Sequence, residues 1–183
     1  MEFNAFLTRL QEVKNISLIE NGYSHIIYEL IYNKILDNQK YMLIDTSSYQ
    51  KRESNRPLIG ENLGAIPDFV ITNRTQNREE IKRLGCIEVK FKDADVDEHL
   101  KTGKNNRLVN YYTRKGYLET YNYHVLYTNG WKWNYYNDKK LQKPTWSFDF
   151  LKEKCNSDTY YDLLKNLARI DWECNDSKLI HIG

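Results

Sequence analysis

The sequence has few of the residues and segments that define several classes of protein. It contains three cysteines, Cys86, Cys155 and Cys174, which lie far apart and form no Cys-x-x-Cys pair. Neither a disulfide framework nor a structural zinc site is therefore predicted. No apolar run approaches the roughly 18 residues that a membrane span requires, and the charged N-terminal segment does not resemble a secretory signal. We expect a cytoplasmic protein with no membrane partner.

A strong excess of charge of either sign is also absent. Lysine and arginine number 27, aspartate and glutamate 25, and the net charge is +2. This balance does not identify a nucleic-acid partner, so such a partner has to be argued from where the charges lie. With three prolines, eight glycines and no low-complexity linker, residues 1–183 are expected to form one domain. We place its core at about residues 17–136 and a C-terminal extension at about 137–183.

Hydrophobic periodicity predicts an α+β order of elements. Helices are expected over residues 3–13 and 17–37, the second of them mostly apolar. β-Prone runs at residues 41–46, 67–72 and 86–91 predict a three-stranded antiparallel meander. A helix is expected over residues 105–121, and then a hairpin over 124–136 with a type I′ turn at Asn129-Gly130. A last helix over residues 158–170 would present one apolar face, made of Tyr161, Leu164, Leu167 and Ala168.

The third β-prone run carries the most informative residues. Alternate side chains of a strand point to opposite faces, so Glu88 and Lys90 share one face, and Ile87, Val89 and Phe91 share the other. This alternation predicts one core face and one charged face. A lone Glu-Val-Lys of this kind is most often a half-solvated strand.

Asp68 favours a more specific interpretation of that strand. It follows Pro67 at the start of the preceding β-prone run, twenty residues before Glu88. A hairpin of this length can bring the two carboxylates side by side. Two carboxylates and a backbone carbonyl form the all-oxygen, incomplete coordination that Mg²⁺ accepts when it also holds water and a phosphate oxygen.

Pro67-Asp68 followed by Glu88-Val89-Lys90 resembles the motif of the PD-(D/E)XK nuclease superfamily, and in particular nuclease domains of bacterial restriction systems. The resemblance covers about residues 17–136. It implies a restriction-endonuclease-like αβββαβ core, with a central mixed sheet flanked by helices, to which this chain adds a C-terminal helix. It further implies that Asp68, Glu88 and the carbonyl of Val89 bind Mg²⁺, for which Mn²⁺ would substitute.

The same resemblance assigns catalytic roles to two further side chains. Lys90 would orient or help to deprotonate the attacking water and would balance charge on the phosphate. Glu29 matches a glutamate that many members of the superfamily carry on the first core helix near the metal. The alternative for Glu29 is a partly exposed position at the flank of the helix, paired with His25 or Lys34.

A group of basic residues follows the catalytic strand and is interleaved with tyrosines. A surface that tracks phosphates beside an active site has this composition, although a solvated charged face has it as well. The predicted DNA-binding residues are Lys101, Lys104, Arg107, Arg114 and Lys115.

Taken together, these features predict a Mg²⁺-dependent endonuclease that hydrolyses DNA phosphodiester bonds. It would be a small standalone restriction enzyme or the cleavage domain of a restriction system. No helix-turn-helix, zinc module or methyltransferase motif is recognisable, so a homodimer or a separate specificity or methyltransferase subunit is a candidate partner. Two alternatives remain: a catalytically silent nucleic-acid-binding module with a nuclease-like fold, and an RNA or repair nuclease.

Overall fold

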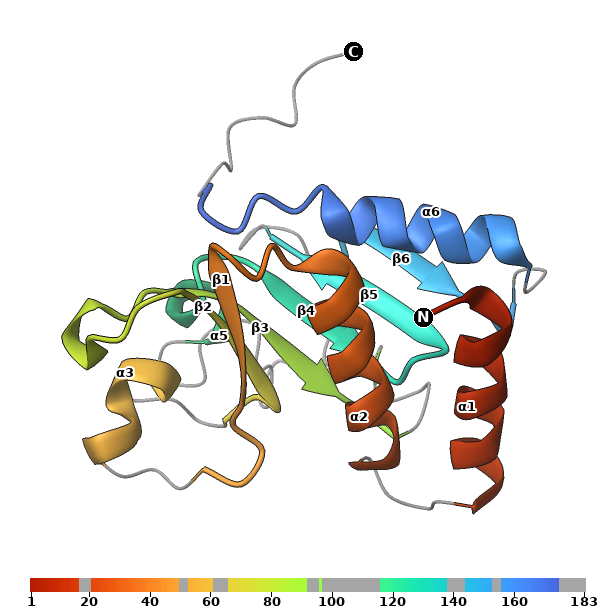
Figure 1. The fold of residues 1–183 in the computed structure, drawn as a ribbon, viewed down its shortest axis with the longest axis horizontal. Coiled ribbons are helices and arrows are strands. Elements are labelled where there is room, and N and C mark those ends of the chain that lie inside the picture. Colours follow the sequence, from red (N-terminus) through yellow and green to blue (C-terminus); the bar gives the residue numbers. More distant parts are fainter. Residues whose placement is uncertain are drawn as a thin grey trace, which may run out of the picture.

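The structure is a computed structural model that describes residues 1–16, 21–49, 53–60, 66–91, 96, 116–137, 144–152 and 156–174. Within these ranges the chain adopts an α+β fold built on one mixed sheet of six strands, as the sequence predicts for the fold class (Figure 1). No helix among the described residues is long and apolar enough to span a membrane.

The strands follow one another across the sheet in chain order. β1 (Tyr41–Asp45), β2 (Phe69–Asn73) and β3 (Arg83–Val89) form the expected antiparallel meander. β4 (Val125–Thr128) runs parallel to β3, and β5 (Lys132–Tyr136) returns antiparallel to β4 as the predicted hairpin. β6 (Trp146–Asp149) was not predicted and adds an antiparallel edge. Its alternation of aromatic and polar residues is the period-2 signal of a strand.

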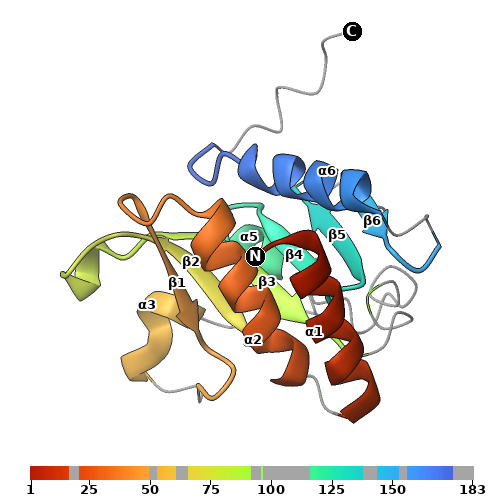
Figure 2. The same cartoon turned by 45° about the vertical axis from the view of Figure 1, so that its right-hand side comes forward.

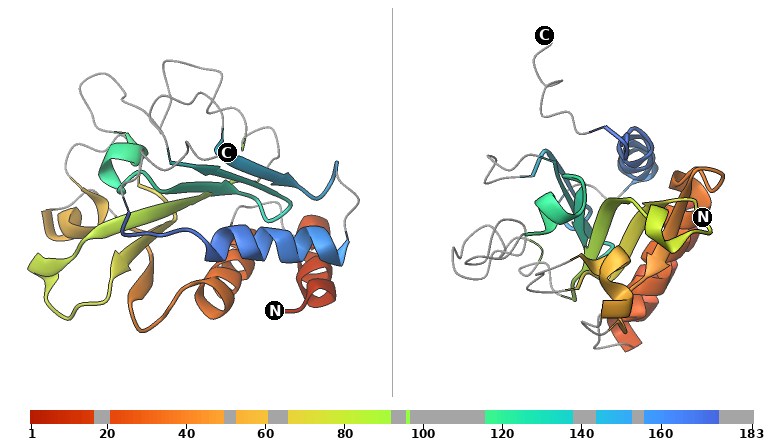
Figure 3. Two further views of the ribbon diagram at one scale, coloured as in Figure 1. Left: turned by 90° about the horizontal axis from the view of Figure 1, so that it is seen from above. Right: turned by 90° about the vertical axis from the view of Figure 1, so that its left-hand side faces the viewer.

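Helices cover the two faces of this sheet unequally (Figures 2 and 3). α1 (Phe3–Ile16), α2 (Asn21–Leu30) and α6 (Ser157–Ala168) lie on one face, and α5 (Tyr117–Thr120) lies on the other. α2 continues into a π-helical segment, η1 (Ile31–Ile35). The short elements are η2 (Glu53–Asn55), α3 (Arg56–Ile59), which has Pro57 in its first turn, and η3 (Arg78–Glu80). Of the helix expected over residues 105–121, only residues 116–121 fall within the described residues, and α5 is their helical part.

The larger core lies beneath α1, α2 and α6. Phe6 and Leu10 of α1 pack with Ile27 of α2 and with residues from both the hairpin and α6. Helices α1 and α6 lie outside the core region predicted for residues 17–136. Both nevertheless contribute residues to the hydrophobic core. The predicted apolar face of α6 was partly wrong: Tyr160, Leu163 and Leu167 are buried, while Tyr161 is 43% exposed.

The turn between β4 and β5 differs from the type I′ turn that Asn129-Gly130 predicted. Type I′ requires a positive φ at both residues, yet among the described non-glycine residues only Asn122 and Tyr123 have one. Gly130 has φ 84°, and a Cβ on it would lie 2.4 Å from Leu10 Cδ2. The glycine is therefore required both for its conformation and for the close approach of α1.

Candidate active site

Asp68 and Glu88 meet at one end of the antiparallel pair β2–β3. Phe69 pairs with Ile87, so the register, extended by one residue, sets Asp68 opposite Glu88. Residues directly opposite each other in an antiparallel pair share a face, with Cβ atoms about 4.5–5.5 Å apart. The backbone supports this extension, because Asp68 Oδ2 accepts a hydrogen bond of 2.7 Å from the Val89 N–H. Just before β2 begins, the Asp68 carboxylate therefore accepts a hydrogen bond that a backbone carbonyl accepts elsewhere in an antiparallel pair.

Glu88 is held at both of its carboxylate oxygens. Lys90 Nζ donates to Oε1 at 2.5 Å, and the Tyr117 hydroxyl donates to Oε2 at 3.0 Å. The ammonium of Lys90 therefore lies beside the carboxylate, as the sequence predicted, whereas the contact with Tyr117 comes from a helix remote in sequence. Tyr117 could not be identified from the sequence as a residue of this site, because it is one of fifteen tyrosines and no sequence pattern indicates the contact.

The face that carries these residues is more buried than the sequence suggested. Glu88 is 2% exposed and Lys90 9%, so the two charged residues share a face as predicted, but the alternative of an ordinary half-solvated strand does not hold. A second hydrophobic cluster covers this side of the sheet. Its aromatic residues come from α5 and the residue after it, from β4 and from β5: Tyr117, Tyr121, Tyr127 and Tyr136. A charge is costly to bury without a partner, and the Lys90–Glu88 ion pair compensates both groups.

Cys86 lies on the same side of the sheet as Glu88, and the charges of both carboxylates affect the pKa of its thiol. It precedes Glu88 by two residues on β3 and is fully buried. Burial, followed by the negative charges of Glu88 and Asp68, raises the pKa of the Cys86 thiol well above its ordinary value. Cys86 therefore stays a neutral, apolar neighbour of the site.

The donor atoms at this site suit a hard cation that takes few ligands from the protein and leaves its other coordination positions to water and substrate. Among the described residues no group of three or more His, Cys, Asp and Glu side chains could hold a metal ion. Asp68, Glu88 and the Val89 carbonyl are instead two carboxylates and a backbone oxygen. Mg²⁺ is commonly bound by one or two carboxylates together with water and substrate phosphates, so this donor set fits it. The Lys90 ammonium supplies positive charge to Glu88 in the structure.

Glu29 has a different neighbourhood from the one that the resemblance implied. Arg9 of α1 donates to Glu29 Oε2 at 2.5 Å, and the two side chains are 37% and 42% exposed. The structure favours the flank interpretation, with Arg9 as partner in place of His25 or Lys34, and we leave Glu29 out of the proposed catalytic set.

The predicted DNA-binding residues Lys101, Lys104, Arg107, Arg114 and Lys115 lie outside the described residues. The helix that follows them, α5, is anchored to β3. Arg83 of β3 donates through Nε to the carbonyl of Thr120 in α5 at 3.2 Å. Its guanidinium also donates to the carbonyl of Pro57 in α3 at 2.9 Å.

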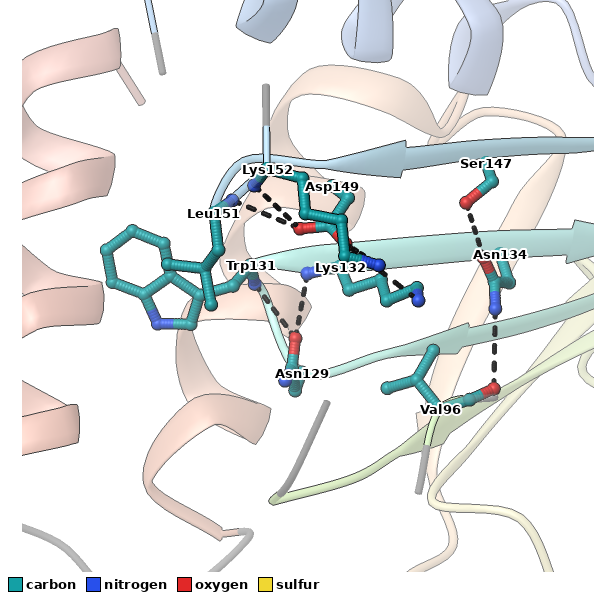
Figure 4. Close-up of polar contacts among 9 residues, drawn as sticks. All are labelled: Val96, Asn129, Trp131, Lys132, Asn134, Ser147, Asp149, Leu151 and Lys152. Carbon is teal, nitrogen blue, oxygen red and sulfur yellow. Dashed lines mark hydrogen bonds and ion pairs between the residues drawn. The ribbon is translucent and has the colours of Figure 1, made fainter. Parts of the chain in front are cut away.

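A row of polar positions continues from Glu88 across the sheet. Glu88 pairs in register with Tyr127, Tyr127 with Asn134, and Asn134 with Ser147. Asn134 is buried, donates to the Val96 carbonyl at 3.3 Å and accepts from the Ser147 hydroxyl at 2.7 Å (Figure 4).

The neighbouring row contains a second buried lysine, which sequence reasoning also did not single out. Lys132 is 7% exposed, and its Nζ lies 3.9 Å from Asp149 Oδ2 (Figure 4). The alternation of Lys132, Trp133 and Asn134 along β5 was a signal that one face of this strand is polar.

Comparison with known proteins adds no relative to this description. No protein-family model, curated protein or solved structure matches the chain. The assignment of a function therefore depends on the geometry of the site and on the sequence motif.

Proposed function

We propose that this protein is a Mg²⁺-dependent nuclease of the PD-(D/E)XK type that hydrolyses phosphodiester bonds of DNA. The observation that carries the proposal is the arrangement of Asp68, Glu88 and Lys90. The register of β2 and β3, extended by one residue, sets Asp68 opposite Glu88, and the Lys90 ammonium lies on the Glu88 carboxylate. The order of α2, β1, β2, β3, α5 and β4 agrees with the αβββαβ core of that superfamily.

Asp68, Glu88 and the carbonyl of Val89 would hold the cation. When bound, Mg²⁺ lowers the pKa of a coordinated water and neutralises negative charge on the phosphate. A binding module would gain nothing from two carboxylates that face phosphate, because they would repel it. The pair of carboxylates therefore favours catalysis over binding alone.

Hydrolysis requires the oxygen of a water molecule to bond to phosphorus as the bond to the leaving oxygen breaks. The proton that the water loses must leave the site, and the leaving oxygen must gain one. Lys90 has the chemistry to orient the water and to stabilise negative charge that builds on the phosphate oxygens. Glu88 lies on β3 of the central sheet, and Asp68 immediately precedes β2 and is tied to the Val89 N–H, which keeps their geometry rigid.

Cleavage assays on three substrates test this function. Plasmid DNA, single-stranded DNA and RNA are incubated with Mg²⁺ or with a chelator, using the wild-type protein and Asp68→Asn. Cleavage of plasmid with Mg²⁺, lost with chelator and in Asp68→Asn, is the expected result. Cleavage of RNA alone would identify a ribonuclease. Binding of DNA without any cleavage, with Mg²⁺ or Mn²⁺, would support the catalytically silent module and overturn the proposal.

A further inference from the structure

Tyr117 is a neutral donor to the proposed metal ligand Glu88 that comes from outside the β2–β3 hairpin. Its hydroxyl is buried, and it reaches Glu88 Oε2 from the first residue of α5. We propose that Tyr117 is a positioning residue that orients the Glu88 carboxylate for cation binding. This inference rests on the proposed function and deepens it.

The orientation of a carboxylate needs such a contact. Rotation about the last bond of a glutamate side chain is broad, so rotamer preference alone does not fix the directions of its two oxygens. Lys90 holds Oε1 and Tyr117 holds Oε2, which together fix the plane of the group. The two donors differ in charge. Lys90 neutralises Glu88, whereas Tyr117 holds it and leaves the negative charge available to a cation.

The surroundings of Tyr117 fix the position of its hydroxyl in turn. The ring is fully buried and contacts the rings of Tyr121 and Tyr127, with centroids 5.9 and 6.5 Å away. The Arg83 contact with the Thr120 carbonyl ties α5 to the same strand that carries Glu88. A donor held this firmly loses little conformational freedom when it makes its hydrogen bond.

The residue that caps the C-terminal end of α5 provides a matched control. Tyr121 is also fully buried and belongs to the same aromatic cluster, but its hydroxyl has no hydrogen-bond partner among the described residues. Tyr117→Phe and Tyr121→Phe therefore remove the same atom from the two ends of this short segment. Only the first substitution removes a donor from Glu88.

The first measurement is Mn²⁺ binding by titration calorimetry, without DNA. Hydrogen bonds to metal ligands typically contribute 10- to 100-fold in affinity, so Tyr117→Phe should weaken Mn²⁺ binding by about 10-fold or more. Tyr121→Phe should bind as the wild type does. Thermal melts of both variants establish that they are folded, and a structural role alone would lower stability without changing the affinity of folded protein for Mn²⁺.

Cleavage kinetics supply a second readout. Tyr117→Phe should need a higher Mg²⁺ concentration for half-maximal cleavage, with much of the rate regained at saturating Mg²⁺. If the wild type binds Mn²⁺ and cleaves DNA, and Tyr117→Phe does both equally well, this inference is overturned and the proposed function stands. If the wild type neither binds Mn²⁺ nor cleaves, the proposed function fails, and this inference fails with it.

Discussion

The carboxylate of Asp68 accepts a hydrogen bond from the backbone N–H of Val89, with 2.7 Å between Oδ2 and the nitrogen. A side chain that immediately precedes β2 thus accepts a backbone hydrogen bond from β3 beside Glu88. Asp68 therefore has a structural role as well as the proposed catalytic one. The two roles can be separated only by a substitution that keeps the hydrogen-bond acceptor.

Asp68→Asn and Asp68→Ala should differ in stability and agree in activity. Asparagine retains an oxygen that can accept from Val89, whereas alanine leaves a partly buried N–H without its partner. An unsatisfied buried donor costs about 1–3 kcal/mol, so Asp68→Ala should unfold at lower urea concentration than Asp68→Asn. Relief of repulsion between the two carboxylates should not offset this loss, because the Lys90 ammonium already offsets the charge of Glu88. Equal stability of the two variants would contradict the structural role.

Lys90→Met should destabilise the protein and not only inactivate it. The Lys90–Glu88 pair is buried, with side-chain exposures of 11% and 3%. Removal of one partner from a buried pair costs about 3–5 kcal/mol, because the other charge is left without compensation. The double variant Glu88→Gln with Lys90→Met should regain much of that loss. Urea denaturation of the two single variants and the double variant measures the coupling.

Mg²⁺ gives a second test of the same pair. In Lys90→Met, a cation on Glu88 would replace the missing ammonium, so Mg²⁺ should raise the melting temperature of this variant. It should not do so in the double variant, which lacks the carboxylate. A melting temperature of Lys90→Met that is insensitive to Mg²⁺ and Mn²⁺ would argue against Glu88 as a metal ligand.

The sequence predicted the pairing of Asp68 with Glu88 because the signals for it are local. Period-2 alternation defines each strand, and the length of the connection between them defines a hairpin. The burial of Glu88 could not be predicted in this way. Tyr117, which covers it, lies 29 residues further along the chain, and no strand pattern shows which helix packs on the polar face. Gly130 shows the same limit, because the contact that requires it comes from α1.

His124 should make the stability of the protein depend on pH. Nε2–H of His124 donates to the carbonyl of Cys174 at 3.0 Å, and Nδ1 lies 2.5 Å from the Tyr135 hydroxyl, which can donate to it when the ring is neutral. Burial lowers the pKa of His124, partly opposed by the hydrogen bond to Cys174 and the charge of Asp171. Below about pH 6.5 the unfolded chain binds more protons at this residue than the folded one does, so the free energy of unfolding falls as pH falls.

The variant His124→Gln isolates this contribution. Glutamine can accept and donate as the neutral ring does, but it does not titrate. Between pH 7 and pH 5 the wild type should lose more stability than the variant, by at most about 1.4 kcal/mol per pH unit. The measurement is urea denaturation of both proteins at several pH values. A parallel fall in the two proteins would show that other groups account for the acid sensitivity.

The basic residues that follow β3 in the sequence should control the salt dependence of the proposed DNA binding. Lys101 and Lys104 are expected to contact phosphates, and each such contact contributes about 0.9 to the slope of log affinity against log salt. Replacing both with alanine, in the Asp68→Asn background that prevents cleavage, should therefore weaken binding and flatten that slope. Fluorescence anisotropy of a labelled duplex at several salt concentrations gives the slope directly.

The matched control removes the same net charge from elsewhere on the molecule. Lys152 and Lys165 have side chains that are 78% and 65% exposed, and Lys165 belongs to α6, which lies on the opposite face of the sheet from α5. Their double alanine variant should keep the wild-type slope, because a change in net charge alone removes no phosphate contact. An equal change in both double variants would show that the effect is one of overall charge. An unchanged slope in the Lys101 and Lys104 variant would move the DNA-binding surface to another part of the chain, for which Arg107, Arg114 and Lys115 are the next residues to replace.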